Sequence, residues 1–167
     1  MEELKIKIVN LLVENAKYTA KDISAMLDAD IEKVDSLIKE LEDEGVIVKY
    51  SAIIDTEAIP QKAVEALIEV KVAPQKLKGF DSYAEELYNF DEVVSLYLMS
   101  GGFDLAVFVA GKDLADIANF VAQKLSVIDG IVGVQTHFIL KKYKIEGQVT
   151  KKGTSPKRQI IQAWKVL

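Results

Sequence analysis

The sequence predicts an α+β protein with two domains, an N-terminal winged helix-turn-helix and a C-terminal ferredoxin-like βαββαβ domain. Two observations predict this fold. Residues 1–55 contain three amphipathic helical stretches followed by two short apolar runs. From residue 63 onward the spacing of apolar residues changes, and the expected order becomes strand, helix, strand, strand, helix, strand up to residue 145. Residues 56–62, which include Pro60 and show no period, are the expected linker.

Three short helices are expected in residues 1–45. The first, Glu2–Glu14, carries leucine and isoleucine at helical spacing. The second, residues 20–27, directly follows Thr19, which matches a capping box together with Asp22 in the first turn. The apolar faces of these helices have only one another to pack against, so the predicted core is small.

The third helix should begin after Asp30, a typical N-cap residue, and stop at Gly45. Val46–Tyr50 and Ala52–Asp55 are then expected to pair as the two strands of a wing. In such a unit the third helix is the element presented to a DNA groove. Polar residues on its outer side and in the wing are the candidate DNA contacts: Lys33, Ser36, Lys39, Lys49 and Tyr50.

In the second domain, strict alternation over Val64–Val72 predicts a half-buried strand. Residues 78–90 and 111–125 carry helical apolar stripes, and Ile131–Tyr143 is the expected last strand. A ferredoxin-like sheet has its two helices on one face, so the other face is open. The apolar candidates for that open face, which we expect a second subunit to cover, are Leu67, Tyr97, Phe138 and Leu140.

Between the two helices, Val93–Met99 and Leu105–Ala110 read as an antiparallel hairpin joined by Ser100-Gly101-Gly102-Phe103-Asp104. Because glycine has no β-carbon, the backbone at the glycine pair can approach a small polar ligand. The Asp104 carboxylate could pair with an ammonium group, or it could cap the turn. The glycine pair could equally serve only as a hairpin turn.

Composition limits the classes of function. The chain has no cysteine and no apolar run of the roughly 20 residues that span a bilayer, and its start does not resemble an export signal, so a cytoplasmic protein without membrane association is expected. Residues 1–50 contain 7 basic residues (lysine plus arginine) and 12 acidic ones (aspartate plus glutamate), residues 51–140 contain 6 and 13, and residues 141–167 contain 8 and 1. Residues 146–167 are therefore expected to form a basic tail. No metal cluster, nucleophilic triad or phosphate loop is present in the sequence, so neither enzymatic activity nor a cofactor is expected.

Two motifs together closely resemble the Lrp/AsnC (feast/famine) family of transcription regulators: the stretch Leu41–Asp55 and the turn Ser100–Asp104. The resemblance covers about residues 1–143. It implies a homodimer, often assembled into octamers, that binds palindromic operators in double-stranded DNA and responds to an amino acid between effector domains. The effector contacts that it implies are Ser100, Gly101, Gly102, Phe103, Asp104, Gln135, Thr136 and His137.

The third helix departs from the family pattern. Members usually carry arginines there, whereas residues 1–55 of this chain contain none and are acidic overall. Since phosphate contacts supply much of DNA affinity, a single head should bind a half-site weakly, unless oligomerisation, the basic tail or helix N-termini compensate.

Two alternatives keep the fold and change the function. One is a ligand-sensing or partner-subunit module that does not bind DNA, which the acidic third helix favours. The other, ranked last, is an enzyme similar to sirohaem decarboxylases. Such an enzyme would need histidine and arginine near a tetrapyrrole, and the chain has one of each, His137 and Arg158, far apart in sequence.

Overall fold

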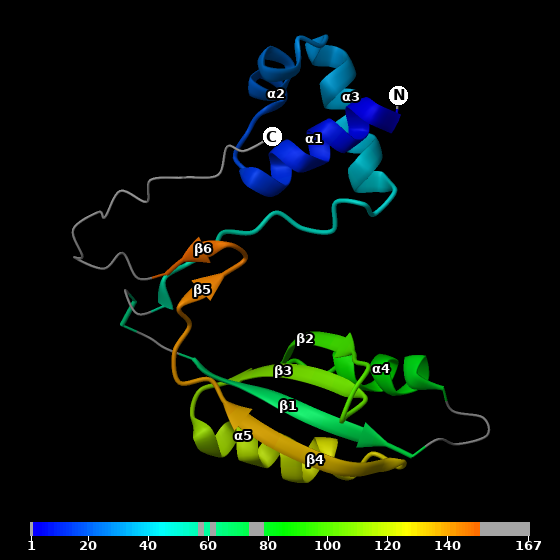
Figure 1. Ribbon diagram of the computed structural model, residues 1–167, viewed down its shortest axis with the longest axis vertical. Helices are drawn as coiled ribbons and strands as arrows, with labels where there is room; N and C mark the ends of the chain where they lie inside the picture. The colour runs from blue at the N-terminus through cyan, green and yellow to red at the C-terminus, as the bar shows by residue number, and fades with distance from the viewer. Residues whose placement is uncertain (1, 57–58, 61–62, 74–78, 151–167) are drawn as a thin grey trace, which may run out of the picture. The chain divides into compact units, whose positions relative to one another are not determined.

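A computed structural model describes residues 2–56, 59–60, 63–73 and 79–150, and it divides the chain into two compact units, Met1–Ile54 and Asp55–Leu167 (Figure 1). The greater part of the predicted basic tail and Arg158 lie outside the described residues. Within the described ranges, no helix has both the length and the apolar character needed to cross a membrane.

The first unit consists of three helices, α1 (Glu2–Glu14), α2 (Ala20–Leu27) and α3 (Ile31–Asp43). Their inward faces share a small core of buried aliphatic side chains: Ile8, Leu12, Ile23, Val34, Leu37 and Leu41. The three helices and their bounds agree with the sequence prediction.

Side-chain caps fix where the helices of the first unit begin. At α2 the Thr19 hydroxyl accepts a hydrogen bond from the backbone N–H of Asp22, and the Asp22 carboxylate accepts one from the Thr19 N–H. This is the predicted capping box. At α3 the Asp30 carboxylate accepts a hydrogen bond from the Lys33 N–H at 2.9 Å. After α3, Gly45 adopts a left-handed conformation with φ of 70°.

The prediction of two wing strands after α3 is wrong. Residues 46–55 contain no strand, and Val48 is 90% exposed. Only Ile47 in this stretch packs against the core of the unit, and its N–H donates to the Leu41 carbonyl at 3.0 Å. A two-stranded hairpin is stable only when a third strand or a helix packs against it. Residues 46–55 make too little apolar contact with the three helices to be stabilised in this way.

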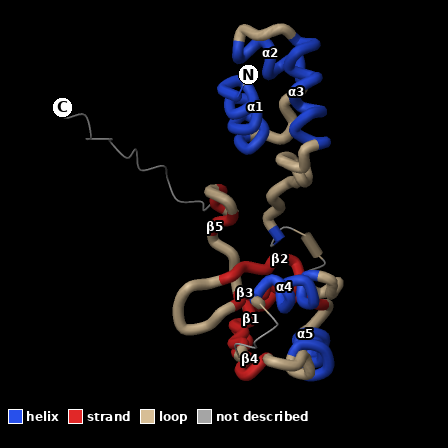
Figure 2. Tube along the Cα trace, turned by 90° about the vertical axis from the view of Figure 1, so that its right-hand side faces the viewer, coloured by secondary structure: helices blue, strands red, loops and turns tan. Residues whose placement is uncertain are grey.

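The second unit contains one antiparallel sheet of β1 (Val64–Val72), β2 (Val93–Leu98), β3 (Leu105–Gly111) and β4 (Ile131–Phe138), in the order β2-β3-β1-β4. Helices α4 (Phe80–Tyr88) and α5 (Leu114–Phe120) lie on the same side of it (Figure 2). The predicted alternation in β1 is confirmed, since Ala66, Ile68 and Val70 are fully buried under the helices.

Three boundaries in the second unit differ from the prediction. The helix expected to end at residue 125 is α-helical to Phe120 and continues as the π-helical turn η2 (Val121–Leu125). The last strand ends at Phe138 instead of residue 143. A short hairpin, β5 (Lys144–Ile145) with β6 (Gln148–Val149), then forms where a polar tail was expected, and both turn residues, Glu146 and Gly147, have positive φ.

The open face of the sheet differs in part from the prediction. Residues directly opposite each other in a sheet share a face. Leu67 lies between Phe108 and His137 in the register, so these three share the open face. Tyr97 belongs there too, because its ring contacts Phe108 edge to face with centroids 5.9 Å apart. Phe138 instead pairs with Ala66 on the helix-covered face, and the 93%-exposed Leu140 lies beyond the strand.

Candidate functional site

The outer face of α3 carries the candidate DNA contacts. Lys33, Ser36 and Lys39 are all exposed there, as the helical spacing requires. The Lys39 ammonium lies 2.7 Å from the Asp35 carboxylate one turn earlier, and this hydrogen bond raises the pKa of Lys39. Lys33 and Ser36 are exposed nearer the start of the helix.

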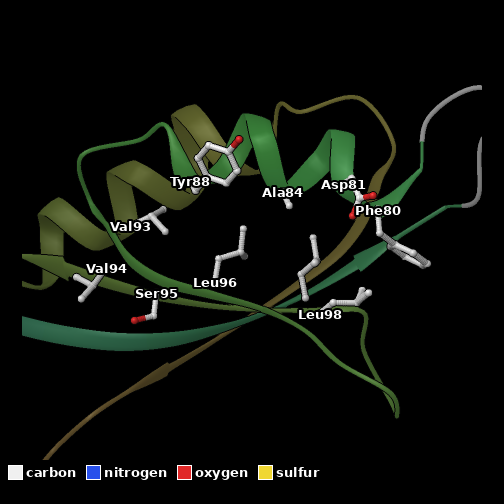
Figure 3. Close-up of a pocket in the computed structure, with 10 residues that line it drawn as sticks. Phe80, Asp81, Ala84, Tyr88, Val93, Val94, Ser95, Leu96 and Leu98 are labelled. Atoms are coloured by element: carbon white, nitrogen blue, oxygen red, sulfur yellow. The ribbon is translucent and has the colours of Figure 1, made fainter. Parts of the chain in front are cut away.

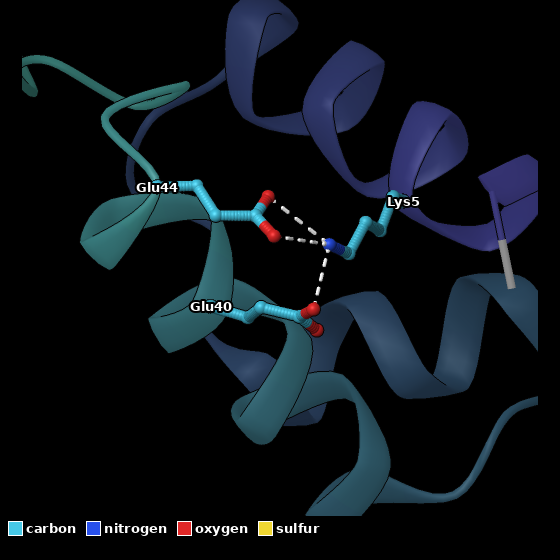
Figure 4. Close-up of polar contacts among 3 residues, drawn as sticks. All are labelled: Lys5, Glu40 and Glu44. Carbon is cyan, nitrogen blue, oxygen red and sulfur yellow. Dashed lines mark hydrogen bonds and ion pairs between the residues drawn. The ribbon is translucent and has the colours of Figure 1, made fainter.

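The acidic side chains at the end of α3 are held by α1, as Figure 4 shows. The Lys5 ammonium lies 2.9 Å from the Glu40 carboxylate and 3.1 Å from that of Glu44. The hydrogen bond to Glu40 is the main cause that raises the pKa of Lys5. Two carboxylates that would repel a phosphate thus share a cation from the neighbouring helix. Sequence reasoning missed this pairing because the partners are 35 and 39 residues apart.

A fourth acidic side chain is engaged by the segment after α3. The Tyr50 hydroxyl donates a hydrogen bond to the Glu42 carboxylate at 2.8 Å. Desolvation, followed by the hydrogen bond to Glu42, raises the pKa of Tyr50 to about 12. Lys49 next to it is exposed. All five predicted DNA contacts are therefore exposed, and two of them, Lys39 and Tyr50, already have an intramolecular polar partner.

The loop Ser100–Asp104 joins β2 to β3 at the end of the sheet where β1 also ends. Ser100 and both glycines are exposed, and a β-carbon placed on Gly101 or Gly102 would meet no heavy atom within 4 Å. The backbone at this tip therefore faces open space that a ligand can enter.

Asp104 anchors the loop to the neighbouring strand. Its carboxylate accepts a hydrogen bond from the Val72 N–H at 2.8 Å, and its own N–H donates to the Val70 carbonyl at 3.0 Å. Its carbonyl accepts a hydrogen bond from the Met99 N–H at 2.8 Å. One of its two carboxylate oxygens thus has a structural role.

The three candidate effector residues of β4 lie apart from the loop within one chain. Gln135, Thr136 and His137 pair with Glu69, Ile68 and Leu67 in the middle of β1, whereas the loop lies beside Val70 and Val72 at its end. Gln135 and His137 share the open face, where His137 Nε2 lies 3.3 Å from the Glu69 carboxylate. Thr136 points to the opposite face, as the period of a strand requires. The structure therefore groups five of the eight candidates and separates the other three.

Comparisons with known proteins agree with both units. Residues 1–48 match the model of a winged helix-turn-helix DNA-binding domain, and residues 65–149 match the Lrp/AsnC ligand binding domain. The HTH-type transcriptional regulator YugG of Bacillus subtilis is 42% identical over 162 residues, which cover 96% of this chain and 98% of that protein. The regulator FL11 of Pyrococcus horikoshii is 30% identical over 86% of this chain and 92% of its own.

Solved structures of regulators share the fold. The transcriptional regulator NMB0573 of Neisseria meningitidis, crystallised as a complex with L-Met, has a TM-score of 0.67 and 25% identity over 87% of this chain and 93% of its own. The structure of MtbAldR has a TM-score of 0.74 over 93% of this chain and all of that one. Because the two sequences are only 20% identical, this similarity shows that the fold is shared and nothing more.

A DNA-binding head and a ligand-binding domain in one chain define a transcriptional regulator. The chain belongs to the Lrp/AsnC family of DNA-binding transcriptional regulators. It is therefore a regulator and not an enzyme, and the comparisons support neither the decarboxylase-like alternative nor a module without DNA binding.

Proposed function

We propose that this regulator binds a double-stranded operator as a homodimer or a higher homo-oligomer and that a small molecule, an amino acid, controls it from the loop Ser100–Asp104. The observation that carries the proposal is the exposed glycine pair with open space in front of it, held in place by Asp104. Backbone N–H groups and the Ser100 hydroxyl suit a carboxylate, and the second Asp104 oxygen suits an ammonium. The L-Met bound to NMB0573 supports an amino acid as the ligand class.

A second copy is part of this proposal. The open sheet face offers Leu67, Tyr97 and Phe108 as an apolar patch, which a facing copy would remove from water. Gln135 and His137 lie on the same face, so in an oligomer they can approach the loop of a neighbouring copy and complete the effector site. Thr136, on the other face, would contribute only through its backbone. Because such a regulator acts on DNA, we place it in the cytoplasm.

For DNA binding we propose contacts from Lys33, Ser36, Lys39, Lys49 and Tyr50. Compensation of Glu40 and Glu44 by Lys5 lowers the repulsion that an acidic α3 would otherwise exert on phosphate. Lys39 can turn toward DNA by exchanging its exposed partner Asp35 for a phosphate at small cost, because exposed ion pairs contribute little to stability. Tyr50 would release its hydrogen bond to Glu42 to make the same contact.

Two measurements on the full chain test the proposal. In the first, DNA from upstream of the chain's own gene is titrated at several salt concentrations, with Lys33→Ala compared against Lys17→Ala, an exposed lysine outside α3. Loss of one phosphate contact should reduce the slope of log affinity against log salt by about 0.9, so a homodimer that loses one contact from each head should show a reduction of about 1.8. Equal slopes for the two variants would overturn the assignment of α3.

In the second measurement, thermal unfolding is followed with each amino acid in turn. An effector at 100 times its dissociation constant should add about 2.7 kcal/mol to the free energy of unfolding. A Gly102→Val variant should abolish the shift, because its side chain fills the space that the ligand needs. No shift with any amino acid would overturn that ligand class.

A further inference from the structure

A groove between α4 and β2 has no part in the proposed DNA or effector contacts. It is open on one side, has a volume of about 360 Å³, and lies where the outer turns of α4 pass over the strand (Figure 3). Phe80, Ala84 and Tyr88 line it from the helix, and Val94, Leu96 and Leu98 line it from the strand. Large apolar side chains remain exposed here, with Leu98 61% and Tyr88 56% accessible.

The strand that floors the groove is an edge of the sheet. No described strand pairs with β2 on the side away from β3. Since the Met99 N–H donates to the carbonyl of Asp104, which directly precedes β3, the alternate residues Leu96 and Leu98 direct their backbone groups outward. An apolar groove beside an unpaired strand edge is suited to an extended segment, which can bond along the edge and insert alternate side chains.

The charged residues of α4 itself are all acidic. Helix α4 carries Asp81, Glu85 and Glu86 and no basic residue, and Asp81 lies at the rim of the groove. The segment of this chain that comes after the described residues has the complementary composition. Residues 151–167 contain five basic residues and no acidic one, and they end in the apolar stretch Ile160–Leu167.

We propose that the C-terminal segment 160–167 docks in the α4–β2 groove of its own chain as an added edge strand. Strand spacing places Ile160, Trp164 and Val166 on one side, which is the side that enters the groove, and the preceding basic residues lie along the acidic helix. Residues 151–159 can span at most about 30 Å, enough to reach across a unit of this size. This docking is distinct from the proposed DNA and effector binding.

Trp164 is the only tryptophan of the chain, so its fluorescence reports on the segment in the intact protein. In the docked state its emission should be blue-shifted and protected from acrylamide, relative to a peptide of residues 151–167. Leu98→Glu should weaken docking by roughly tenfold or more, equivalent to at least 1.4 kcal/mol, and should move the quenching toward that of the peptide. Val127→Glu, at a 68%-exposed valine outside the groove, should leave it unchanged.

The charge contribution has its own test. Asp81→Lys combined with Glu85→Lys should increase quenching at low salt, whereas Asp129→Lys, outside the groove, should not. Three results would overturn the proposal: quenching of the intact chain equal to that of the peptide, protection that Leu98→Glu leaves unchanged, and protection that disappears on dilution, which would assign the segment to a second copy. A change of oligomeric state in Leu98→Glu without a change in quenching would assign the groove to contact between copies instead.

Discussion

The carboxylate of Asp104 accepts a hydrogen bond from the backbone N–H of Val72, with 2.8 Å between the two atoms. The bond joins the loop between β2 and β3 to the end of β1, the central strand that touches both β3 and β4. A ligand bound at Asp104 would therefore contact a residue that is also attached to the central strand.

The first prediction separates the structural role of Asp104 from its proposed role toward ligand. Asp104→Ala leaves the partly buried Val72 N–H without its acceptor and should lower the free energy of unfolding by about 1 to 2 kcal/mol. Asp104→Asn keeps an acceptor oxygen and should lower it by less than half as much. Denaturant unfolding of both variants measures the difference.

Effector binding should respond differently to the same two variants. Asp104→Asn removes the charge that faces an ammonium group, so affinity for an amino acid should fall roughly tenfold, or about 1.4 kcal/mol. Calorimetric titration measures this change. Unaltered affinity in the Asn variant would show that Asp104 serves the fold alone.

The second prediction concerns the start of α3. Asp30→Ala removes the side chain that accepts the Lys33 N–H and should destabilise the first unit by about 1 kcal/mol. Asp30→Asn should be nearly neutral, because asparagine caps helices as well as aspartate does. Circular dichroism during urea unfolding distinguishes them, and equal losses in the two variants would show that the effect is not one of capping.

The third prediction is a pH dependence at Tyr50. Its pKa is raised to about 12 from an ordinary value of 10.0, so the protonated phenol is favoured in the folded state. The stabilisation is fully present below pH 10 and is lost as the pH rises through about 12. The phenolate absorbance of the native protein minus that of Tyr50→Phe should therefore appear near pH 12. Glu42→Ala should lower this midpoint only in part, because desolvation is the larger cause; a midpoint near 10 in the unaltered protein would contradict the assignment.

The fourth prediction tests the open sheet face. Tyr97→Lys places a cation on the apolar patch that we propose to lie between two copies, and a symmetric dimer would carry it twice. At about 1.4 kcal/mol per copy, the dissociation constant should rise by roughly 100-fold. Sedimentation equilibrium measures this. Val127→Lys, at a 68%-exposed valine outside the sheet, is the control and should leave assembly unchanged.

Local patterns were sufficient to predict most elements of the fold. The capping box at Thr19, the cap at Asp30 and the alternation of β1 each depend on residues close in sequence. The prediction of the wing failed for the converse reason. Val46–Tyr50 has the composition of a strand, but a strand also requires a partner strand and a surface to pack against. Neither can be inferred from five residues.

The candidate sites were less accessible to sequence reasoning. The attachment of Asp104 to Val72 spans 32 residues, and that of Lys5 to Glu44 spans 39, so no local pattern indicates either. Placing Phe138 on the open face failed because the assignment of a strand residue to a face depends on its register with the neighbouring strand. The α4–β2 groove exists only once a helix and a strand edge are brought together.

The π-helical turn η2, which directly follows α5, differs from an α-helix in its hydrogen bonding. There the Ser126 N–H donates to the Val121 carbonyl five residues back, so the turn holds one residue more than an α-helix would. That additional residue sets the direction of Leu125, which is fully buried, and of Lys124, whose ammonium lies 2.6 Å from the Glu92 carboxylate. Removing Gln123 would relax the turn to ordinary helix and rotate α5 by about 100° relative to the residues on the C-terminal side of the turn. This one additional residue therefore determines which side chains seal that corner of the core.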